Sequence, residues 1–163
     1  LPPDILKVGV FVNATEQGIG DIVKAYRLDL VQLHGNESPE FCRTVRKIRP
    51  VIRAISVATA EDIATSADMY QNAADYFLFD TKTSLFGGSG KQFDWSALAS
   101  YTGNTPFFLS GGIGSDDAKR LQCMQHPLLH AIDINSRFET EPAGRKDAIL
   151  IKALMHELDK IDN

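Results

Sequence analysis

The stretch VGVFVNATEQGIGDIVKAYRLDLVQL, residues 8–33, decides the fold class because it contains one complete strand–helix–strand unit. VGVFV at Val8–Val12 is almost entirely apolar, as a strand covered on both faces should be. Residues Gln17–Tyr26 then place their apolar side chains at helical spacing. LVQL at Leu30–Leu33 is the next short apolar run. The stretch therefore predicts two parallel strands joined by a helix.

This unit recurs along the rest of the chain, about six times in all. We expect further strands at Val51–Val57, Asp75–Phe79, Pro106–Ser110 and Leu129–Ile134. We expect one helix to begin at Ser38, which would be its N-cap. Further helices are expected at Thr59–Asn72, Trp95–Ser100, Ser115 to about Gln125, and Lys146–Ile161. Such an alternation predicts a parallel sheet with helices outside it.

Two α/β architectures fit this alternation, an open doubly wound sheet and a TIM (β/α)8 barrel. A barrel of eight units typically needs about 200 residues or more. The chain has 163 residues, so the count alone favours the open sheet, and it also allows a barrel without its first two units. No linker or low-complexity segment divides the chain, and we expect residues 1–163 to form a single domain.

The composition excludes several classes of protein. Hydrophobic residues make up 44% and charged residues 23%, a globular balance. The net charge is -4 and the basic residues are scattered, so we expect no nucleic-acid partner. No apolar run approaches the ~18 residues of a membrane span. The opening LPPDILK is not typical of a signal peptide, and we expect no membrane partner.

The cysteines and histidines do not form a recognisable metal or disulfide pattern. Cys42 and Cys123 fall on the apolar faces of expected helices, so we expect two reduced core thiols in a cytoplasmic protein. His126 and His130 have a ligand-like spacing, but Pro127 breaks the helix that this spacing needs. We therefore expect no metal site.

In either architecture the functional residues gather at the carboxyl ends of the strands. The residues that follow the expected strands make a polar ring: Asn13, Gln32, His34, Gly35, Ser56, Asp80, Lys82, Ser110, Gly111, Gly112, Asp133, Asn135 and Ser136. SGGIG, residues 110–114, is either a phosphate cradle built on glycine N–H groups or only a tight turn. Asp116 and Asp117 would compete with an anion there.

Asp80 ends an apolar run and is followed by a glycine-rich stretch. It is either a cap or a salt-bridge partner of Lys82, or a proton donor or acceptor, because partial desolvation favours a protonated carboxyl. His34 is either a structural hydrogen bonder or a second acid–base group.

GGSGK, residues 87–91, lacks the spacing of a nucleotide P-loop and is followed by Gln92. We expect it to be a flexible loop or lid over the Asp80 site.

The motifs VGVFVN, VQLHG, FDTKT, GGSGKQFDW, LSGGI and DINSRFE together resemble the phosphoribosylanthranilate isomerase family of tryptophan biosynthesis, over essentially the whole chain. The resemblance implies a TIM barrel of which this chain holds about six units, strands three to eight, as its carboxy-terminal three-quarters. It also implies a phosphorylated small-molecule substrate, no cofactor, and a monomer or a homodimer.

The resemblance assigns roles to residues of this sequence. It implies that Asp80 is the general acid and that Gln32 and His34 bind substrate in the pocket. It implies a phosphate-binding end made of Gly111, Gly112, Asp133, Asn135 and Ser136. The family often has Ser-Ser where this chain has Asn-Ser, so the contact at Asn135 departs from the pattern.

Half of the family's site is not in this sequence. The family has a Lys-Ile-Cys-Gly motif on its first strand, whose cysteine is the general base, and an arginine on its second unit that holds the anthranilate carboxylate. Cys42 and Cys123 do not match that motif, because neither is followed by glycine.

The implied reaction is an Amadori rearrangement of N-(5-phosphoribosyl)anthranilate to 1-(2-carboxyphenylamino)-1-deoxyribulose 5-phosphate. An acid protonates the ring oxygen, and a base takes the proton from the second ribose carbon. One alternative is a catalytically incomplete, phosphate-binding barrel fragment without the base. Another is a different phosphate-binding barrel enzyme, such as indole-glycerol-phosphate synthase, which would place lysine and glutamate at several strand ends.

Overall fold

The computed structural model describes residues 2, 4–82, 92–140 and 144–160, and all structural statements below refer to these. The main sheet contains β1 (Val8–Phe11), β2 (Leu30–Leu33), β3 (Val51–Val57), β4 (Tyr76–Thr81), β5 (Phe107–Leu109) and β6 (Leu129–Ile132). The helices are α1 (Glu16–Tyr26), α2 (Pro39–Arg46), α3 (Ala60–Tyr70), α4 (Ala118–Cys123) and α5 (Ala148–Asp159). Three 3-10 turns, η1 (Trp95–Ser100), η2 (Ser115–Asp117) and η3 (Ser136–Phe138), and a hairpin of β7 (Glu139–Thr140) and β8 (Arg145–Lys146) complete the described elements.

The strands of the main sheet follow one another in the order β1-β2-β3-β4-β5-β6, and every neighbouring pair is parallel. A doubly wound sheet reverses its strand order at a switch point. This sheet never reverses, which is the winding of a TIM barrel. The open doubly wound sheet favoured by the residue count is therefore wrong. The barrel is not closed within the described residues, because β6 and β1 do not pair.

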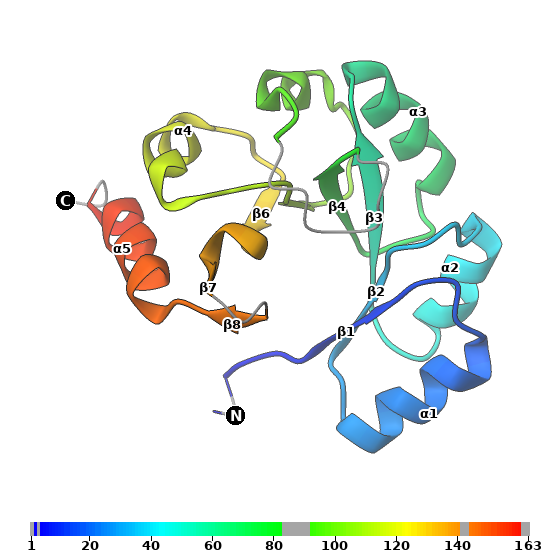
Figure 1. Ribbon diagram of the computed structural model, residues 1–163. Helices are drawn as coiled ribbons and strands as arrows, with labels where there is room; N and C mark the ends of the chain where they lie inside the picture. Colours follow the sequence, from blue (N-terminus) through cyan, green and yellow to red (C-terminus); the bar gives the residue numbers. More distant parts are fainter. Residues whose placement is uncertain (1, 3, 83–91, 141–143, 161–163) are drawn as a thin grey trace.

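The helices of the described ranges cover the outside of the curved sheet. Figure 1 shows α1, α2 and α3 along one side and α4 and α5 at the other. Apolar side chains fill the layer between sheet and helices, and they include Phe77, Phe79 and Phe107 with Tyr101 packed edge-on against them. These aromatic contacts anchor η1 to the outer face of β4 and β5.

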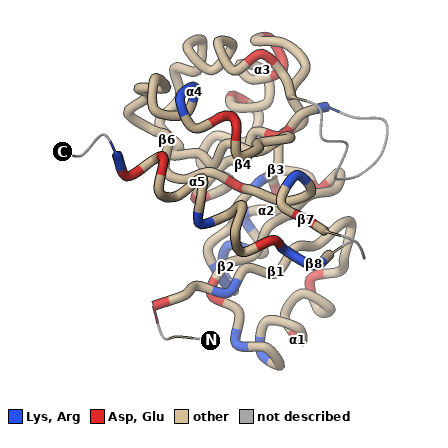
Figure 2. The backbone as a smooth tube through the Cα atoms, turned by 60° about the vertical axis from the view of Figure 1, so that its left-hand side comes forward, with Lys and Arg blue, Asp and Glu red and all other residues tan. Residues whose placement is uncertain are grey.

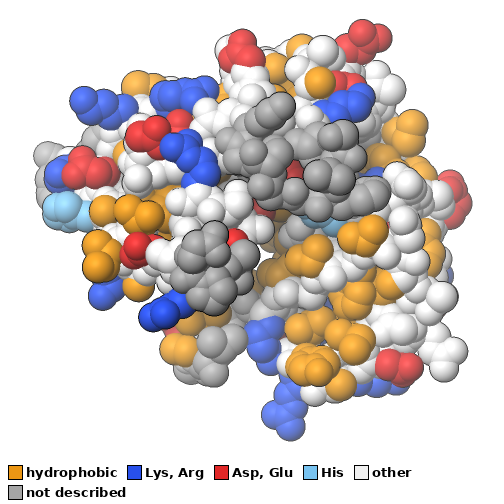
Figure 3. Space-filling model, viewed as in Figure 1, with side chains coloured by type: hydrophobic (Ala, Val, Ile, Leu, Met, Phe, Trp, Pro, Cys, Tyr) orange, Lys and Arg blue, Asp and Glu red, His pale blue; other side chains and the backbone are white. Residues whose placement is uncertain are grey.

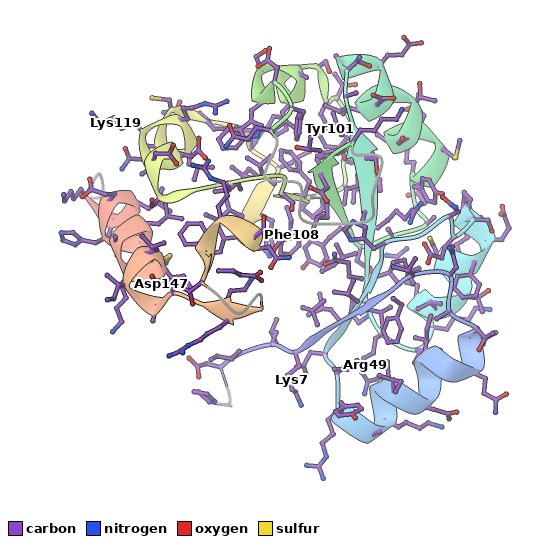
Figure 4. The ribbon with its side chains drawn as sticks, in the orientation of Figure 1. Lys7, Arg49, Tyr101, Phe108, Lys119 and Asp147 are labelled. Carbon is purple, nitrogen blue, oxygen red and sulfur yellow. The ribbon has the colours of Figure 1, made fainter. Side chains whose placement is uncertain are left out.

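A second, smaller apolar cluster lies on the inner face of the sheet. It joins Ile52, Ala54 and Leu78, and Phe108 of β5 packs against it (Figure 4). Successive residues of a strand point to opposite faces, so Leu78 points inward between two outward phenylalanines. Asp80, two residues after Leu78, therefore points inward at the carboxyl end of β4.

Local sequence signals explain where the helices begin. The side chains of Thr15, Ser38 and Thr59 each accept a hydrogen bond from the first turn of the helix that follows. Asp62 completes a capping box with Thr59. The expected strands Leu30–Leu33 and Val51–Val57 are confirmed without change.

Several expected boundaries are wrong. β4 continues to Thr81, because it goes on pairing with β3 beyond Phe79. The short helix expected near Trp95–Ser100 is confirmed and is the 3-10 helix η1, whereas the helix expected from Ser115 begins as η2 and ends at Cys123. Lys146 does not open α5, because it pairs in the β7–β8 hairpin, and Asp147 caps the helix instead.

The two cysteines occupy different environments. Cys42 is fully buried, and burial raises the pKa of its thiol to about 11. Cys123 is exposed, so the expectation of a second core thiol is wrong. The reason is helical geometry: the buried side chains of α4 are Ala118 and Leu121, and a residue two positions beyond Leu121 lies on the opposite side of the helix.

His126 and His130 lie on opposite faces of the sheet. His126 packs against Tyr101 and Phe107 in the outer layer, whereas His130 packs against Phe108 in the inner one. Their ligand-like spacing therefore does not bring them together. Among the residues that the structure describes, no group of three His, Cys, Asp or Glu side chains could hold a metal ion.

The surface carries mixed charge, and one apolar region stands out. Lysines, arginines and acidic residues are interspersed over the described part of the chain (Figure 2). The edge strand β1 and the residue after it expose Val8, Val10 and Val12 by 42%, 59% and 46%. Figure 3 shows apolar side chains gathered in this part of the molecule. No helix in the described ranges is both long enough and apolar enough to cross a membrane.

Candidate active site

Two predicted site residues meet at the carboxyl end of the sheet, His34 after β2 and Asp80 in β4. His34 Nε2 lies 3.5 Å from Asp80 Oδ2, and the two side chains are 22% and 21% exposed. The second oxygen, Oδ1, accepts a hydrogen bond from the backbone N–H of Thr81 at 2.8 Å. Asp80 is thus half-buried, has one oxygen fixed by the backbone, and keeps the other toward the imidazole.

Gln32 orients this histidine. Its amide nitrogen Nε2 lies 3.0 Å from His34 Nδ1. When the amide donates to Nδ1, the neutral imidazole carries its proton on Nε2, the nitrogen that faces Asp80. Lys82 does not pair with Asp80, because its ammonium lies 3.7 Å from Asp62. Gln32 therefore contacts His34, and His34 in turn contacts Asp80. In this Gln32–His34–Asp80 line the Asp80 carboxyl group is held in place and can exchange a proton.

Asp133, just after β6, is a second carboxylate beside this line. Its Oδ2 accepts a hydrogen bond from Ser110 Oγ at 3.0 Å. Burial raises the pKa of Asp133, and the negative charge of Asp80 adds to that rise, while the bond from Ser110 opposes it. Two neighbouring carboxyl groups thus stand at the carboxyl ends of β4 and β6.

The predicted glycine turn lies against the end of β4. Gly111 and Gly112 have φ values of 93° and 67°, a region that favours glycine. A Cβ atom on Gly111 would come within 2.8 Å of the backbone nitrogen of Thr81, so no side chain fits there. Within the described residues, the N–H groups of Gly111, Gly112 and Ile113 donate to no partner. Such a run of N–H groups suits an anion.

A lysine that the sequence analysis missed lies beside residues 135–136, which were predicted to bind phosphate. Lys146 of β8 donates to Asn135 Oδ1 and to Glu139 Oε1, the latter at 2.6 Å. The hairpin brings this ammonium to the loop after β6. Its charge also opposes the rise in the pKa of Asp133. Lys146 was missed because its position was assigned to the start of the last helix.

The sequence analysis also missed a buried ion pair beneath the loops. Arg53 Nη1 lies 2.9 Å from Glu37 Oε2, and the side chains are only 9% and 3% exposed. Glu37 accepts from the N–H groups of Asn13 and Gly35, and Arg53 donates to the Gly35 carbonyl. The pair therefore ties the loop after β1 to the loop that carries His34. The signal for it was an arginine inside the largely apolar strand VIRAISV.

The aspartates after the glycine turn are not free competitors for an anion. Asp116 binds Arg137 at 2.7 Å, and the buried carboxylate of Asp117 binds both Arg120 and Arg137. Their negative charges are therefore neutralised locally. The proposed lid, residues 87–91, lies outside the described residues.

Comparison with known proteins gives one consistent result. A family model described as N-(5'phosphoribosyl)anthranilate (PRA) isomerase matches residues 2–157. An N-(5'-phosphoribosyl)anthranilate isomerase of Parabacteroides distasonis is 48% identical over 153 residues, which are 93% of this chain and 68% of that relative.

Solved structures agree with the sequence relatives. The crystal structure of phosphoribosyl anthranilate isomerase from Thermotoga maritima superposes with a TM-score of 0.82 at 34% identity, over 98% of this chain and 75% of that one. A structure of the isomerase in complex with reduced 1-(o-carboxyphenylamino)-1-deoxyribulose 5-phosphate has a TM-score of 0.78 at 30% identity, covering 98% of this chain and 74% of that one.

Proposed function

This chain belongs to the N-(5'-phosphoribosyl)anthranilate isomerase family, and we propose that Asp80 is the general acid of its reaction. The enzyme isomerises phosphoribosylanthranilate in tryptophan biosynthesis. The observation that carries the proposal is the pairing of Asp80 with His34 at the carboxyl end of the sheet, 3.5 Å apart. The inward direction of Asp80 supports it, since a substrate in the barrel mouth would meet this carboxyl group.

The chemistry assigned to Asp80 is proton delivery to the furanose ring oxygen, which opens the ring to an iminium. We propose that His34 holds Asp80 through its Nε2–H and stabilises the carboxylate left after the proton has gone. Gln32 would keep the imidazole in the tautomer that allows this. A positioned acid of this kind typically contributes about 100- to 10,000-fold to the rate.

We propose that the substrate phosphate binds beyond the glycine turn. The N–H groups of Gly111 and Gly112 would meet its oxygens, with Asn135 and Ser136 at its other side. Asp133 is the least suited member of this set, because a carboxylate repels phosphate. Burial raises the pKa of Asp133 and so favours its neutral carboxyl, the form that would not repel phosphate and could donate a hydrogen bond.

We further propose that β1 to β6 correspond to strands three to eight of the family barrel and that residues 1–163 form one domain. The sequential strand order supports this, and so does the coverage of 75% of the Thermotoga maritima chain. The two remaining strands would lie between β6 and β1. The family's general-base cysteine, on its first strand, would then stand beside β6 and face Asp80 across the mouth.

We also propose a monomer or homodimer in the cytoplasm. A structural relative is described as mutually generated monomers of a dimeric isomerase, which supports both states. The two free thiols, one buried and one exposed, fit a reducing compartment.

The test of the general acid is Asp80→Asn in protein that turns over the substrate. The amide keeps the shape but cannot deliver the proton, so we expect turnover to fall at least ~100-fold with little change in the free energy of unfolding. Asp62→Asn is the matched control, because Asp62 caps α3 outside the site. Turnover of Asp80→Asn within about twofold of the wild type would refute the assignment.

A further inference from the structure

The turn after β5 is held by one buried carboxylate, that of Asp117, which is 5% exposed. Its Oδ2 accepts from the N–H of Gly114 at 2.8 Å and from Gln92 Nε2 at 2.6 Å. Arg137 Nη1 lies 3.3 Å from the same oxygen, and Arg120 Nη1 lies 3.2 Å from Oδ1. Donors from several separate segments thus converge on a single side chain.

Two of these donors also fix the peptide bond that follows Gly112. The carbonyl oxygen of Gly112 accepts from Gln92 Nε2 at 2.9 Å and from Arg137 Nη1 at 3.1 Å. In a trans peptide the N–H points opposite to the carbonyl. The N–H of Ile113 is therefore directed away from Gln92 and Arg137, and within the described residues it donates to no protein partner.

Gln92 is itself held in place from two directions. Its side-chain oxygen accepts from Arg120 Nη1 at 2.7 Å. The next residue, Phe93, donates its backbone N–H to Thr81 Oγ1 at 3.1 Å, directly beside Asp80. Through Gln92, Asp117 therefore connects the chain that leaves the general-acid strand with the turn after β5.

We infer that Asp117 is a positioning residue for phosphate recognition, an inference that rests on the phosphate site proposed above. Its carboxylate keeps Gln92 and Arg137 where they orient the Gly112 carbonyl, and so aims the N–H groups of the turn at the phosphate. Asp117 does not touch the phosphate, since both are anions. Its effect passes through the peptide bonds of the turn.

The direction in which a mutation of Asp117 changes phosphate affinity distinguishes a positioning role from a simple effect of charge. Removing a negative charge near an anion site strengthens anion binding if charge alone matters. In Asp117→Asn, one acceptor oxygen becomes an NH2 donor that opposes the N–H groups of Gln92 and the arginines. The turn then loses its support, so a positioning role predicts weaker phosphate binding.

The experiment compares two probes by calorimetry on the protein and its variants. One probe is reduced 1-(o-carboxyphenylamino)-1-deoxyribulose 5-phosphate, and the other is the same compound without its phosphate. We expect the wild type to prefer the phosphorylated probe. Asp117→Asn should bind that probe at least about tenfold more weakly, the effect of one charge-assisted hydrogen bond. Affinity for the other probe should stay within about twofold.

Two further variants complete the design. Asp116→Asn is the matched control, because the Asp116 side chain is 70% exposed and its ion pair within the described residues is with Arg137, so we expect unchanged or slightly stronger phosphate binding. Gln92→Ala removes a donor to Gly112 without changing the charge, and we expect it to weaken binding of the phosphorylated probe alone. It serves as the test if Asp117→Asn does not fold, as judged by circular dichroism and thermal unfolding.

The outcomes are distinguishable. A wild type that does not prefer the phosphorylated probe, or does not bind it, overturns the proposed phosphate site itself. A wild type that does prefer it, together with an unchanged or strengthened preference in both Asp117→Asn and Gln92→Ala, overturns the role of Asp117 and leaves the site standing.

Discussion

At the level of single residues, the protonation of Asp133 makes the free energy of unfolding depend on pH. Burial raises the pKa of this carboxyl above its ordinary value of 3.8, so the folded protein holds the proton more tightly than the unfolded chain. The stabilising contribution is complete below 3.8 and is lost as pH rises through the raised pKa. Asp133→Asn should therefore gain stability relative to the wild type as pH increases, measured by urea unfolding at several pH values.

Asp62 supplies a control of opposite sign. Hydrogen bonds from the backbone N–H groups of Ala58 and Thr59 lower the pKa of its carboxyl. Its contribution is therefore present above its ordinary pKa and is lost as pH falls. Asp62→Asn should be less stable than the wild type at neutral pH and approach it in acid. The assignment for Asp133 fails if the two variants change in the same direction.

The two cysteines make a second prediction at this scale. Cys42 is buried with a pKa of about 11, so it is almost never a thiolate near neutral pH, whereas Cys123 is exposed. Titration of the folded 163-residue chain with dithiodipyridine should modify one thiol quickly, and the second only in denaturant. Cys123→Ser should abolish the fast phase. A fast phase that survives in this variant would mean that the helix carrying Cys42 opens readily.

At the level of elements, the buried pair of Glu37 and Arg53 holds the loops after β1 and β2. Arg53→Met removes one partner and leaves a carboxylate without its countercharge in a site that is 3% exposed. We expect a loss of about 3–5 kcal/mol in the free energy of unfolding, measured in urea.

An ion pair on the surface serves as the comparison for this loss of stability. Arg46 and Asp75 lie 2.7 Å apart, with side chains 43% and 24% exposed. Arg46→Met should cost no more than about 1 kcal/mol. Adding Glu37→Gln to Arg53→Met should recover part of the loss, because the uncompensated charge is gone. Equal losses for the two arginine variants would show that burial of the first pair does not matter.

The elements also show what the sequence could and could not predict. Apolar runs and N-cap residues placed β2, β3 and the start of α2 correctly, because both signals are local. The end of β4 was misplaced because it depends on register with β3, where Asp80 pairs with Ser56. The Gln32–His34–Asp80 line follows from strand alternation and could be anticipated. The contacts of Asp117 and Lys146 depend on distant segments and could not.

At the level of the whole molecule, the β1 edge of the described sheet exposes apolar side chains that other protein molecules could contact. Val8, Val10 and Val12 present an alternating apolar row there, with exposures of 42%, 59% and 46%. Unpaired, apolar edge strands favour association with other chains. We expect a preparation of the 163-residue chain itself to self-associate as its concentration rises, measured by analytical ultracentrifugation.

Val10→Lys should shift this association to higher concentration, because a charge on an edge strand disfavours pairing. Ile22→Lys on α1 is the matched control, since Ile22 is 42% exposed but lies away from the strand edge. Identical behaviour of the two variants would show that the association does not use the sheet.

The sequential strand order has a consequence for how the protein is made. Each strand from β2 to β6 pairs with the strand of the main sheet that was synthesised just before it. As the ribosome delivers each strand–helix unit, the unit can therefore dock on the edge left by its predecessor. The sheet can grow in one direction, from the amino end to the carboxyl end. The two carboxyl groups of the site would then be assembled in order of translation, Asp80 with the fourth strand and Asp133 after the sixth.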